Sequence, residues 1–306
     1  MPPLQIHPEV ESALREGRPV VALESTLLAH GLPAEHRETV AVELERVVRS
    51  EGAVPATIAV FDGCLQVGLS EAGLARVIAP GVSKASLRDL AFALTRSADT
   101  FATTVASTMF IAAKAKIRYF ATGGIGGVHR GASETFDESA DLKALSEYPV
   151  LVVSAGAKAV LDLPKTLERL ETLGVPVVGY RTRDLPAFYS ASSGVPLSAW
   201  SESESELARV FAHHRELFGG GMLVVQPPPA KVAWPRSEID GLITEALETA
   251  EKEGIVGARV TPFLLSWMAC ATEDRIVETN IALVMENARL AARIARAEVE
   301  ARSPRP

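Results

Sequence analysis

Short, continuously apolar segments alternate with segments of helical periodicity along the chain, and this alternation restricts the possible folds. Val20–Leu23, Val150–Ser154 and Met222–Val225 each contain at most one polar residue. A strand that is apolar on both sides must be covered on both sides, as in a largely parallel sheet between helices. We therefore expect an α/β fold, a three-layer α/β/α sandwich around a mainly parallel or mixed sheet. No shift in composition marks a boundary, so residues 1–306 are expected to form a single domain.

Periodicity and turn residues place further elements. Apolar residues recur as one stripe through Ala34–Ser50, which indicates a helix. Asp62 and Gly63 separate the apolar segments Thr57–Phe61 and Leu65–Leu69, which predicts a β-hairpin. The same criteria predict strands at Ile117–Ala121 and Val175–Gly179, and helices at Ser86–Thr95, Thr103–Ala115, Ala157–Leu173 (interrupted or bent at Pro164), Ser237–Glu253 and Arg275–Ala301.

Composition and charge exclude several classes of protein. Apolar residues make up 47% of the chain, which is too many for a disordered protein. The formal net charge is −7 and Lys and Arg form no cluster, which argues against nucleic-acid binding. The two cysteines, Cys64 and Cys270, match no disulfide or zinc pattern. The N-terminal segment has no signal-peptide core, and no apolar run reaches the roughly 20 residues of a membrane helix, so we expect a cytoplasmic protein without membrane contact.

The most unusual segment is glycine-rich and covers residues 122–131. Four of the five residues at 123–127 are glycine, directly after a predicted strand. The segment is neither a Walker A loop nor a G-x-G-x-x-G loop. Glycines would let the backbone approach a ligand closely, and His129 and Arg130 behind them suit an anion. The alternative is a tight turn without a ligand.

Charged residues that follow predicted strands are candidates for catalysis, because ligands of open α/β sheets bind at the carboxyl ends of the strands. Glu24 follows a buried strand, where burial would favour its protonated, acidic form; it could also be a helix-capping or ion-paired acid. Lys158 is expected in the first turn of a helix, where the dipole disfavours its charge and favours a nucleophilic amine; it could also be a surface lysine. Lys84, with Ser86 and Arg88, could bind phosphate or begin a solvated helix.

Two pairs of polar residues have helical spacing. Asp137 and Asp141 are four positions apart and could hold a hard divalent cation from one helix face, although acidic residues also stabilise a helix N-terminus. Asn280 and Asn287 are seven positions apart and would share a face of the last predicted helix. If these amides are buried, they need partners and could face a ligand; the alternative is exposure to solvent.

The chain resembles the pseudouridine-5′-phosphate glycosidase family, also called the indigoidine synthase A family, from about Leu4 to Ala297. The resemblance is carried by the segments VALESTLLAHGLP, GAVPATIAVFDGCLQVGL, SKASLRDL, TTVASTMFIAAKAKIRYFATGGIGGVHRGASETFDESADL, VVSAGAKAVLDL, LGVPVVGYRTRDLPAFY, ARVTPFLL and TNIALVMENARLAARIA. Several long segments in the same order make the resemblance specific.

This resemblance implies reversible cleavage of the C–C glycosidic bond of pseudouridine 5′-phosphate with water, giving uracil and ribose 5-phosphate. It also implies a homotrimer and one divalent cation per subunit, usually Mn²⁺. Lys158 would form a Schiff base with C1 of the ring-opened sugar, and Glu24 would donate a proton. Asp137 would bind the metal. The resemblance places Lys84, Val105, Ser139, Ala140 and Asp141 at the substrate, and we add His129 and Asn280 from their positions.

The chemistry of a C–C bond favours this assignment. Such a bond offers no heteroatom to protonate, so an oxocarbenium route between two carboxylates gains little. Capture of C1 as an imine creates an electron sink, and this route needs one lysine and one acid. Two alternatives remain: a hydrolase or transferase for N-nucleosides, and a sugar-phosphate-binding protein without catalytic activity.

Overall fold

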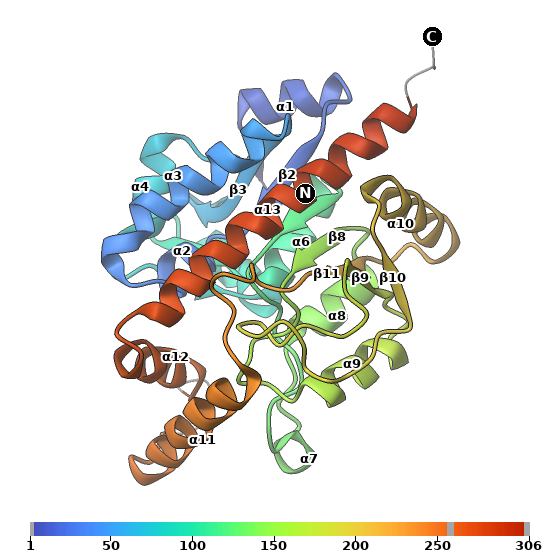
Figure 1. The fold of residues 1–306 in the computed structure, drawn as a ribbon. Coiled ribbons are helices and arrows are strands. Elements are labelled where there is room, and N and C mark those ends of the chain that lie inside the picture. The colour runs from blue at the N-terminus through green and yellow to red at the C-terminus, as the bar shows by residue number, and fades with distance from the viewer. Residues whose placement is uncertain (1–2, 256–259, 303–306) are drawn as a thin grey trace.

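The centre of the molecule is a mixed, mostly parallel sheet, which confirms the predicted fold class (Figure 1). The computed structural model describes residues 3–255 and 260–302. The main path of the sheet runs in the order β1 (Leu4–Ile6), β4 (Cys64–Val67), β3 (Val54–Phe61), β2 (Val20–Leu23), β7 (Tyr119–Ala121), β8 (Leu151–Ser154), β11 (Met222–Val225), β9 (Val177–Tyr180) and β10 (Ala199–Ser201); β6 (Thr100–Thr103) branches from β3 and pairs with β5 (Ser83–Ala85).

Helices cover both faces of this sheet. On the near face of Figure 1, α13 (Arg275–Arg302) packs on β2, β7 and β8 and lies against α3 (Ala34–Ser50) and α10 (Glu204–Phe218). On the far face, α6 (Val105–Lys114) packs on β2 and β3 and contacts α8 (Ala140–Glu147). The remaining helices are α1 (Pro8–Arg15), α2 (Thr26–His30), α4 (Glu71–Ile78), η1 (Leu87–Asp89), α5 (Leu90–Thr95), α7 (Ala132–Thr135), α9 (Leu163–Thr172), α11 (Arg236–Lys252) and α12 (Val260–Ala271).

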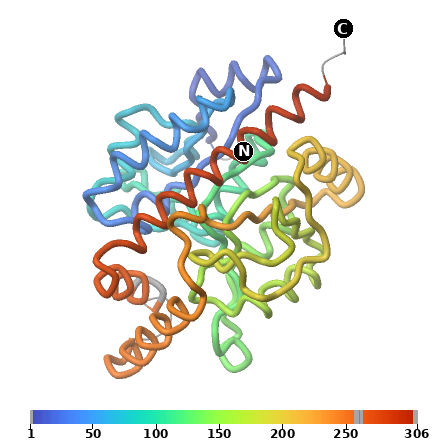
Figure 2. Tube along the Cα trace, viewed as in Figure 1, coloured from blue at the N-terminus to red at the C-terminus, as the bar shows by residue number. Residues whose placement is uncertain are grey.

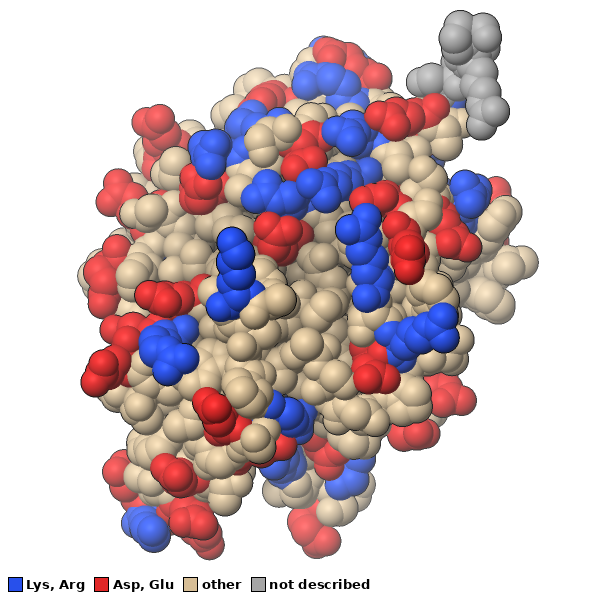
Figure 3. Space-filling model, viewed as in Figure 1, with Lys and Arg blue, Asp and Glu red and all other residues tan. Residues whose placement is uncertain are grey.

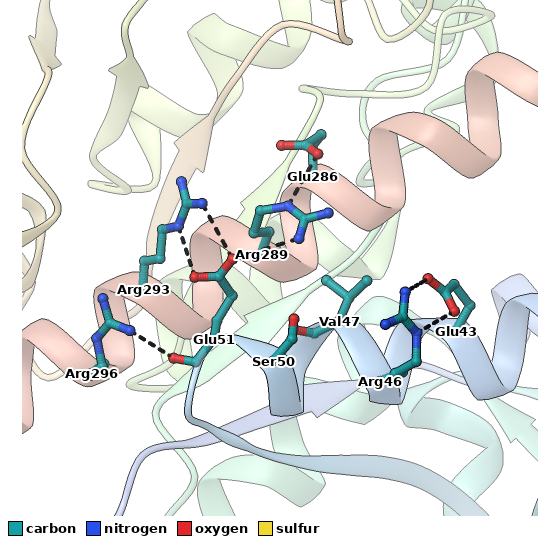
Figure 4. Close-up of polar contacts among 9 residues, drawn as sticks. All are labelled: Glu43, Arg46, Val47, Ser50, Glu51, Glu286, Arg289, Arg293 and Arg296. Atoms are coloured by element: carbon teal, nitrogen blue, oxygen red, sulfur yellow. Dashed lines mark hydrogen bonds and ion pairs between the residues drawn. The ribbon is translucent and has the colours of Figure 1, made fainter.

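Ion pairs fix α13 against the end of α3 (Figure 4). Arg293 on α13 donates from Nε to Glu51 Oε2 at 3.0 Å, and Arg296 donates to the backbone carbonyl of Glu51 at 3.1 Å. Glu51 is the residue at which α3 ends, so these bonds also satisfy a carbonyl of the helix terminus. The course of α13 across the whole near face is clearest in Figure 2.

Segments with strong local signals have the predicted structure. The helix at Ala34–Ser50 and the strand at Met222–Val225 have the expected bounds. The hairpin of β3 and β4 is antiparallel, and Asp62 and Gly63 both have positive φ, at 54° and 68°. Both central residues of a type I′ turn require such values, which is why Asp-Gly is a strong hairpin signal.

The prediction of a helix at Ala157–Leu173 is wrong at its start. The helix α9 begins at Leu163, with Pro164 in its first turn and Asp162 Oδ1 accepting the amide of Lys165. Proline is tolerated in a first turn because its missing N–H would have no partner there. The preceding segment instead bonds to residue Ile125 of the glycine-rich loop. The helix predicted at Ser86–Thr95 is divided into η1 and α5.

Within residues 3–255 and 260–302, no helix combines the length and apolarity that a bilayer-spanning segment needs. The two cysteines, Cys64 and Cys270, are free.

Candidate active site

Glu24 and Thr122 stand side by side where two neighbouring parallel strands end. Leu23 of β2 pairs with Ala121 of β7, so the next residue of each strand emerges at the same edge. Glu24 is 9% exposed and Thr122 is 1% exposed. The hydroxyl of Thr122 donates a hydrogen bond to Oε1 of Glu24. The buried carboxyl group is thus held in one orientation at the carboxyl edge of the sheet.

The environment of Glu24 favours its protonated form. Burial raises the pKa of its carboxyl group, and the nearby charge of Asp141 acts in the same direction. The positive charge of Lys158 and the hydrogen bond from Thr122 oppose this rise but do not cancel it. A buried carboxylic acid that keeps its proton is suited to act as a general acid.

Two lysines belong to the same electrostatic cluster. Lys84, on β5, is exposed as a whole residue, but desolvation of its ammonium group, and next the charge of Lys158, lower its pKa. The charges of Glu24 and Asp141 act on Lys84 in the opposite direction. Four side chains from widely separated parts of the sequence therefore interact at one edge of the sheet. Glu24, Lys84, Asp141 and Lys158 therefore form one cluster of charged side chains.

Lys158 is not in a helical turn, contrary to the prediction. It is half-buried in the segment between β8 and α9, and its amide donates to the carbonyl of Ile125 at 3.0 Å. Gly156, two residues earlier, has φ of 87°, a left-handed value that turns the chain away from the strand direction. The argument from a helix dipole is therefore wrong for Lys158. Its place beside the glycine-rich loop and near Glu24 is fixed by backbone bonds instead.

Close packing explains the glycines at 123–127. A Cβ atom at Gly124 would lie 2.5 Å from the ring of Phe188, and one at Gly126 would lie 2.3 Å from Oγ of Ser139. A Cβ atom at Gly127 would similarly lie 2.4 Å from Oγ1 of Thr166. Any side chain at these positions would displace its neighbours. The glycines let protein groups, rather than a ligand alone, approach the loop.

Several amides of this loop are bonded to the protein itself. The amide of Ile125 donates to the carbonyl of Gly156, that of Gly126 to Oδ2 of Asp141, and that of Val128 to Oγ1 of Thr166. These three amides are therefore not available for a bound anion. The loop connects the segment of Lys158 to α8.

Asp141 connects three elements and is not placed to form a metal pair with Asp137. It is 6% exposed, and its two carboxylate oxygens accept the amides of Ala106 at 2.9 Å and Gly126 at 2.7 Å. Helix α8 begins at Ala140, so Asp137 lies outside the helix and the two aspartates share no helix face. The prediction of a cation held by this pair is wrong. Across the described ranges, the carboxylates, imidazoles and thiols form no group of three that could hold a metal.

Asp137 itself is exposed, and its Oδ2 lies 3.8 Å from Nδ1 of His129. The amide of His129 also donates to the carbonyl of Asp137 at 3.0 Å. The two residues therefore form a pair at the outer side of the glycine-rich loop. A single exposed carboxylate fits a hard divalent ion that keeps most of its waters, as Mg²⁺ and related ions commonly do.

Both asparagines of α13 are buried, so the alternative of solvent exposure is wrong. Asn287 donates to the carbonyl of Thr122 at 2.8 Å and accepts a bond from Gln226 at 2.9 Å. Asn280 donates weakly to the carbonyl of Gly31, whereas its Oδ1 atom is buried without a hydrogen-bond partner among the described residues. Asn287 thus supports the backbone at Thr122, and Asn280 has a free acceptor at the glycine-rich loop.

The start of two helices completes the cluster. Val105 is buried in the first turn of α6, and Ala140 is the exposed first residue of α8. Ser139 precedes α8, and its Oγ accepts the amide of Asp141 at 3.2 Å. Asp141 bonds to the first turn of α6, so the two helix N-termini lie close together. Paired N-termini favour a negatively charged ligand group.

The sequence placed Thr122 only at the start of the glycine-rich segment, and the structure adds its hydrogen bond to Glu24. The signal was present, since Thr122 follows a predicted strand as Glu24 does. Its role depends on a bond between residues 98 positions apart, which periodicity cannot identify.

The chain is similar to known proteins over nearly its whole length. Residues 9–297 match a family described as "Indigoidine synthase A like protein". A pseudouridine-5′-phosphate glycosidase of Herpetosiphon aurantiacus is 52% identical, covering 96% of this chain and 98% of its own. The protein of the same name from Escherichia coli is 48% identical, covering 96% of this chain and 95% of its own.

Two solved structures have the same fold. A prealnumycin C-glycosynthase in complex with ribulose 5-phosphate gives a TM-score of 0.91 at 38% identity and covers 98% of both chains. An indigoidine synthase A-like protein from Thermotoga maritima gives a TM-score of 0.86 at 32% identity, covering 96% of this chain and 95% of its own. Both the sequence and the fold therefore lead to one assignment: the chain belongs to the indigoidine synthase A-like family, and its relatives from Herpetosiphon aurantiacus and Escherichia coli are named pseudouridine-5′-phosphate glycosidases.

Proposed function

We propose that this protein catalyses the reversible cleavage of the C–C glycosidic bond of pseudouridine 5′-phosphate with water, giving uracil and ribose 5-phosphate. The observation that carries the proposal is a buried acid, Glu24, whose environment favours its protonated form beside the two lysines Lys84 and Lys158. The names of the relatives support it, as does a C-glycosynthase with the same fold that was crystallised with ribulose 5-phosphate.

The proposed reaction uses Lys158 as nucleophile and Glu24 as proton donor. Neutral Nζ of Lys158 bonds to C1 of the sugar as the ring C1–O bond breaks, and a proton passes from the nitrogen to the ring oxygen. The nitrogen lone pair then forms a protonated imine with C1 as the bond to the uracil carbon breaks, and that carbon takes a proton from Glu24. Water adds to C1 and the C–N bond breaks, which releases ribose 5-phosphate, restores the amine and returns a proton to Glu24. Each step needs one nucleophilic amine and one acid, and the cluster contains both.

Substrate recognition is proposed to involve several parts of the site. Lys84 supplies a positive charge for the 5′-phosphate, and Val105, Ser139, Ala140 and Asp141 at the paired helix N-termini lie on the same side of the cluster. The free Oδ1 of Asn280 can accept an N–H of the base. His129, near the end of the glycine-rich segment, is also proposed to contact the substrate.

A divalent cation, Mn²⁺ or a similar ion at one per subunit, is part of the proposal. Asp137 would hold it through one carboxylate oxygen, with His129 beside it and water completing the coordination. When bound, such an ion supplies positive charge near the substrate phosphate. Asp137 and His129 form a pair on the outer side of the glycine-rich loop, where the ion would bind.

A homotrimer, a cytoplasmic location and a single domain are further parts of the proposal. The trimer is supported by family membership alone. The location is supported by the substrate, because a doubly charged phosphate ester does not cross a membrane unaided. One continuous hydrophobic core that includes residues from α1 to α13 supports the single domain.

The experiment is to compare turnover of pseudouridine 5′-phosphate with turnover of uridine 5′-phosphate. We expect release of uracil from the first and none above background from the second. Cleavage of uridine 5′-phosphate would favour an N-nucleoside hydrolase. Tight binding of ribose 5-phosphate without cleavage of either compound would favour a sugar-phosphate-binding protein.

A further inference from the structure

A cavity of about 470 Å³ opens at the amino ends of β2 and β7, the opposite edge of the sheet from Glu24. Its walls are α1, the segment before β2, the segment between α6 and β7, and the last turns of α13. Val20 and Tyr119, the first residues of the two strands, form its floor. The length of the strands therefore separates the cavity from the candidate active site. Cavities that bind small molecules commonly have volumes of about 300–1,000 Å³.

The walls of the cavity are strongly basic. They carry six Lys and Arg residues but only two acidic residues, Glu11 and Glu298. This excess contrasts with the whole chain, whose formal charge is −7. In Figure 3, Lys and Arg side chains gather over the upper part of the near face, where α1 and the second half of α13 lie in Figure 1. A local positive field in an acidic protein favours an anionic ligand.

One carboxylate is shared among three arginines at this cavity. Glu298 is 8% exposed, and its Oε1 lies 2.5 Å from Arg302, 3.4 Å from Arg118 and 3.7 Å from Arg215. One negative charge therefore faces three positive charges. Burial, and next the charge of Arg215, lower the pKa of Arg118. The arginines repel one another, and three positive charges against one negative charge leave the cluster with an excess of two positive charges.

Two buried donors face Glu298 without a close hydrogen bond of good geometry. Oη of Tyr119, which lines the cavity, and Nη1 of Arg215, which lies behind it 3.7 Å from Oε1 of Glu298, make no such bond in the part of the chain that the structure describes. Both side chains pack on Phe211, Tyr119 edge-on at 6.0 Å and Arg215 at 5.4 Å from the ring centre. Burial, and next the charge of Glu298 and a hydrogen bond to it, raise the pKa of Tyr119, so its hydroxyl keeps its proton and can donate.

We propose that this cavity binds the phosphate group of a small molecule, at a site separate from the one that cleaves the glycosidic bond. The excess of two positive charges around Glu298 matches a phosphate dianion, and guanidinium groups such as those of Arg118 and Arg302 bind phosphate oxygens in pairs of parallel hydrogen bonds. The hydroxyl of Tyr119, which also lines the cavity, supplies a further donor. Free phosphate and a phosphate ester share this chemistry, and the cavity has room for either. This inference does not depend on the proposed function.

The test measures phosphate binding to the full chain by equilibrium dialysis with radiolabelled inorganic phosphate. Lys84→Ala is used as the background, because it weakens the phosphate site proposed for catalysis. We expect this protein still to bind one phosphate per chain. Arg118→Gln combined with Arg302→Gln should lower the affinity for that phosphate at least tenfold. Arg209→Gln, an exposed arginine of α10, is the matched control and should leave it unchanged. Competition by ribose 5-phosphate that exceeds competition by inorganic phosphate would identify an ester as the ligand.

A conservative variant separates binding from a structural role. Tyr119→Phe removes only the hydroxyl and should weaken phosphate binding several-fold while the protein stays folded by circular dichroism. The proposal is wrong if the Lys84→Ala protein binds no phosphate at millimolar concentration, or if Tyr119→Phe and the double arginine variant leave binding unchanged. A third outcome also contradicts the proposal: the double arginine variant changes the oligomeric mass, and the protein with an unaltered cavity binds no phosphate. In that case a second copy of the chain would occupy the cavity.

Discussion

At the scale of single residues, the account depends on how the surroundings of Glu24 and of the two lysines differ. Burial of Glu24 makes loss of its proton costly, and the hydrogen bond from Thr122 orients its carboxyl group while opposing part of that cost. Lys84 is held near Lys158, whose charge is one of the causes that lower the pKa of Lys84. An acid whose pKa is raised and a lysine beside it are the two groups that imine chemistry requires.

The first prediction concerns Glu24→Gln. Turnover should fall by about 10²–10⁴-fold, the usual contribution of a general acid. The stability of the folded variant, in contrast, should increase relative to that of the wild type. The pKa of Glu24 is raised in the folded state, so the folded wild type loses stability as pH rises from the ordinary glutamate pKa through the raised value. Glutamine carries no such cost. The free energy of unfolding, measured with urea at pH 4 and pH 8, should therefore increase for the variant relative to the wild type at the higher pH. A relative increase at the lower pH would contradict the assigned pKa shift.

The second prediction concerns Thr122→Val, which removes the hydroxyl that bonds to Glu24. We expect kcat to fall by more than tenfold with little change in KM. The reason is that Glu24 loses its orientation, whereas the contacts that bind the substrate are kept. Thr122→Ser keeps the hydroxyl and should retain most of the activity. If serine is as inactive as valine, packing at this position matters and the hydrogen bond does not.

The position of Glu24 could be predicted from the sequence because four apolar residues directly precede it. The partner Thr122 could not, since the bond crosses from one strand to the next. The same limit applies to Asn280 and Asn287: seven-residue spacing placed them on one face, but only tertiary packing decided that this face is buried.

At the scale of elements, Asp141 joins the first turn of α6, the glycine-rich loop and α8. The sequence showed an acidic residue near a helix start, which is its ordinary place. It could not show that both oxygens would bond to amides outside that helix. The start of α9 was predicted too early for a related reason, because backbone bonds to the loop at Ile125 prevail over local helical preference near Lys158.

The third prediction is that Asp141→Asn destabilises the protein by about 1–3 kcal/mol. Asparagine keeps one acceptor, but its NH₂ group would face a backbone N–H where the aspartate has an oxygen. Urea denaturation measures the loss. Asp137→Asn is the matched control, because Asp137 is exposed and should change stability little while reducing metal-dependent turnover. Equal stability of Asp141→Asn and the wild type would contradict the role assigned to Asp141.

At the scale of the whole molecule, the sheet separates two chemically different edges. The carboxyl edge carries the acid and lysines of the candidate active site, and the amino edge carries the basic cavity around Glu298. The alternation of apolar strands and helices was sufficient to predict the layered architecture. The branch of β5 and β6 from β3 was not predictable, because these short strands carry no strong periodicity.

The fourth prediction is the oligomeric state. Light scattering after gel filtration should give about three times the chain mass of 32.6 kDa at micromolar concentration. A species of the single-chain mass would contradict the proposed homotrimer.

The central claim is a covalent bond between Lys158 and the sugar, and borohydride trapping tests it most directly. Incubation with ribose 5-phosphate and borohydride should reduce the imine to a stable adduct on the peptide that contains Lys158. Lys158→Ala should lose both the adduct and turnover, whereas Glu24→Gln should still form the adduct because the acid acts on the base. An adduct on Lys84 would exchange the roles of the two lysines. No adduct on any peptide of an enzyme that cleaves pseudouridine 5′-phosphate would contradict the imine mechanism.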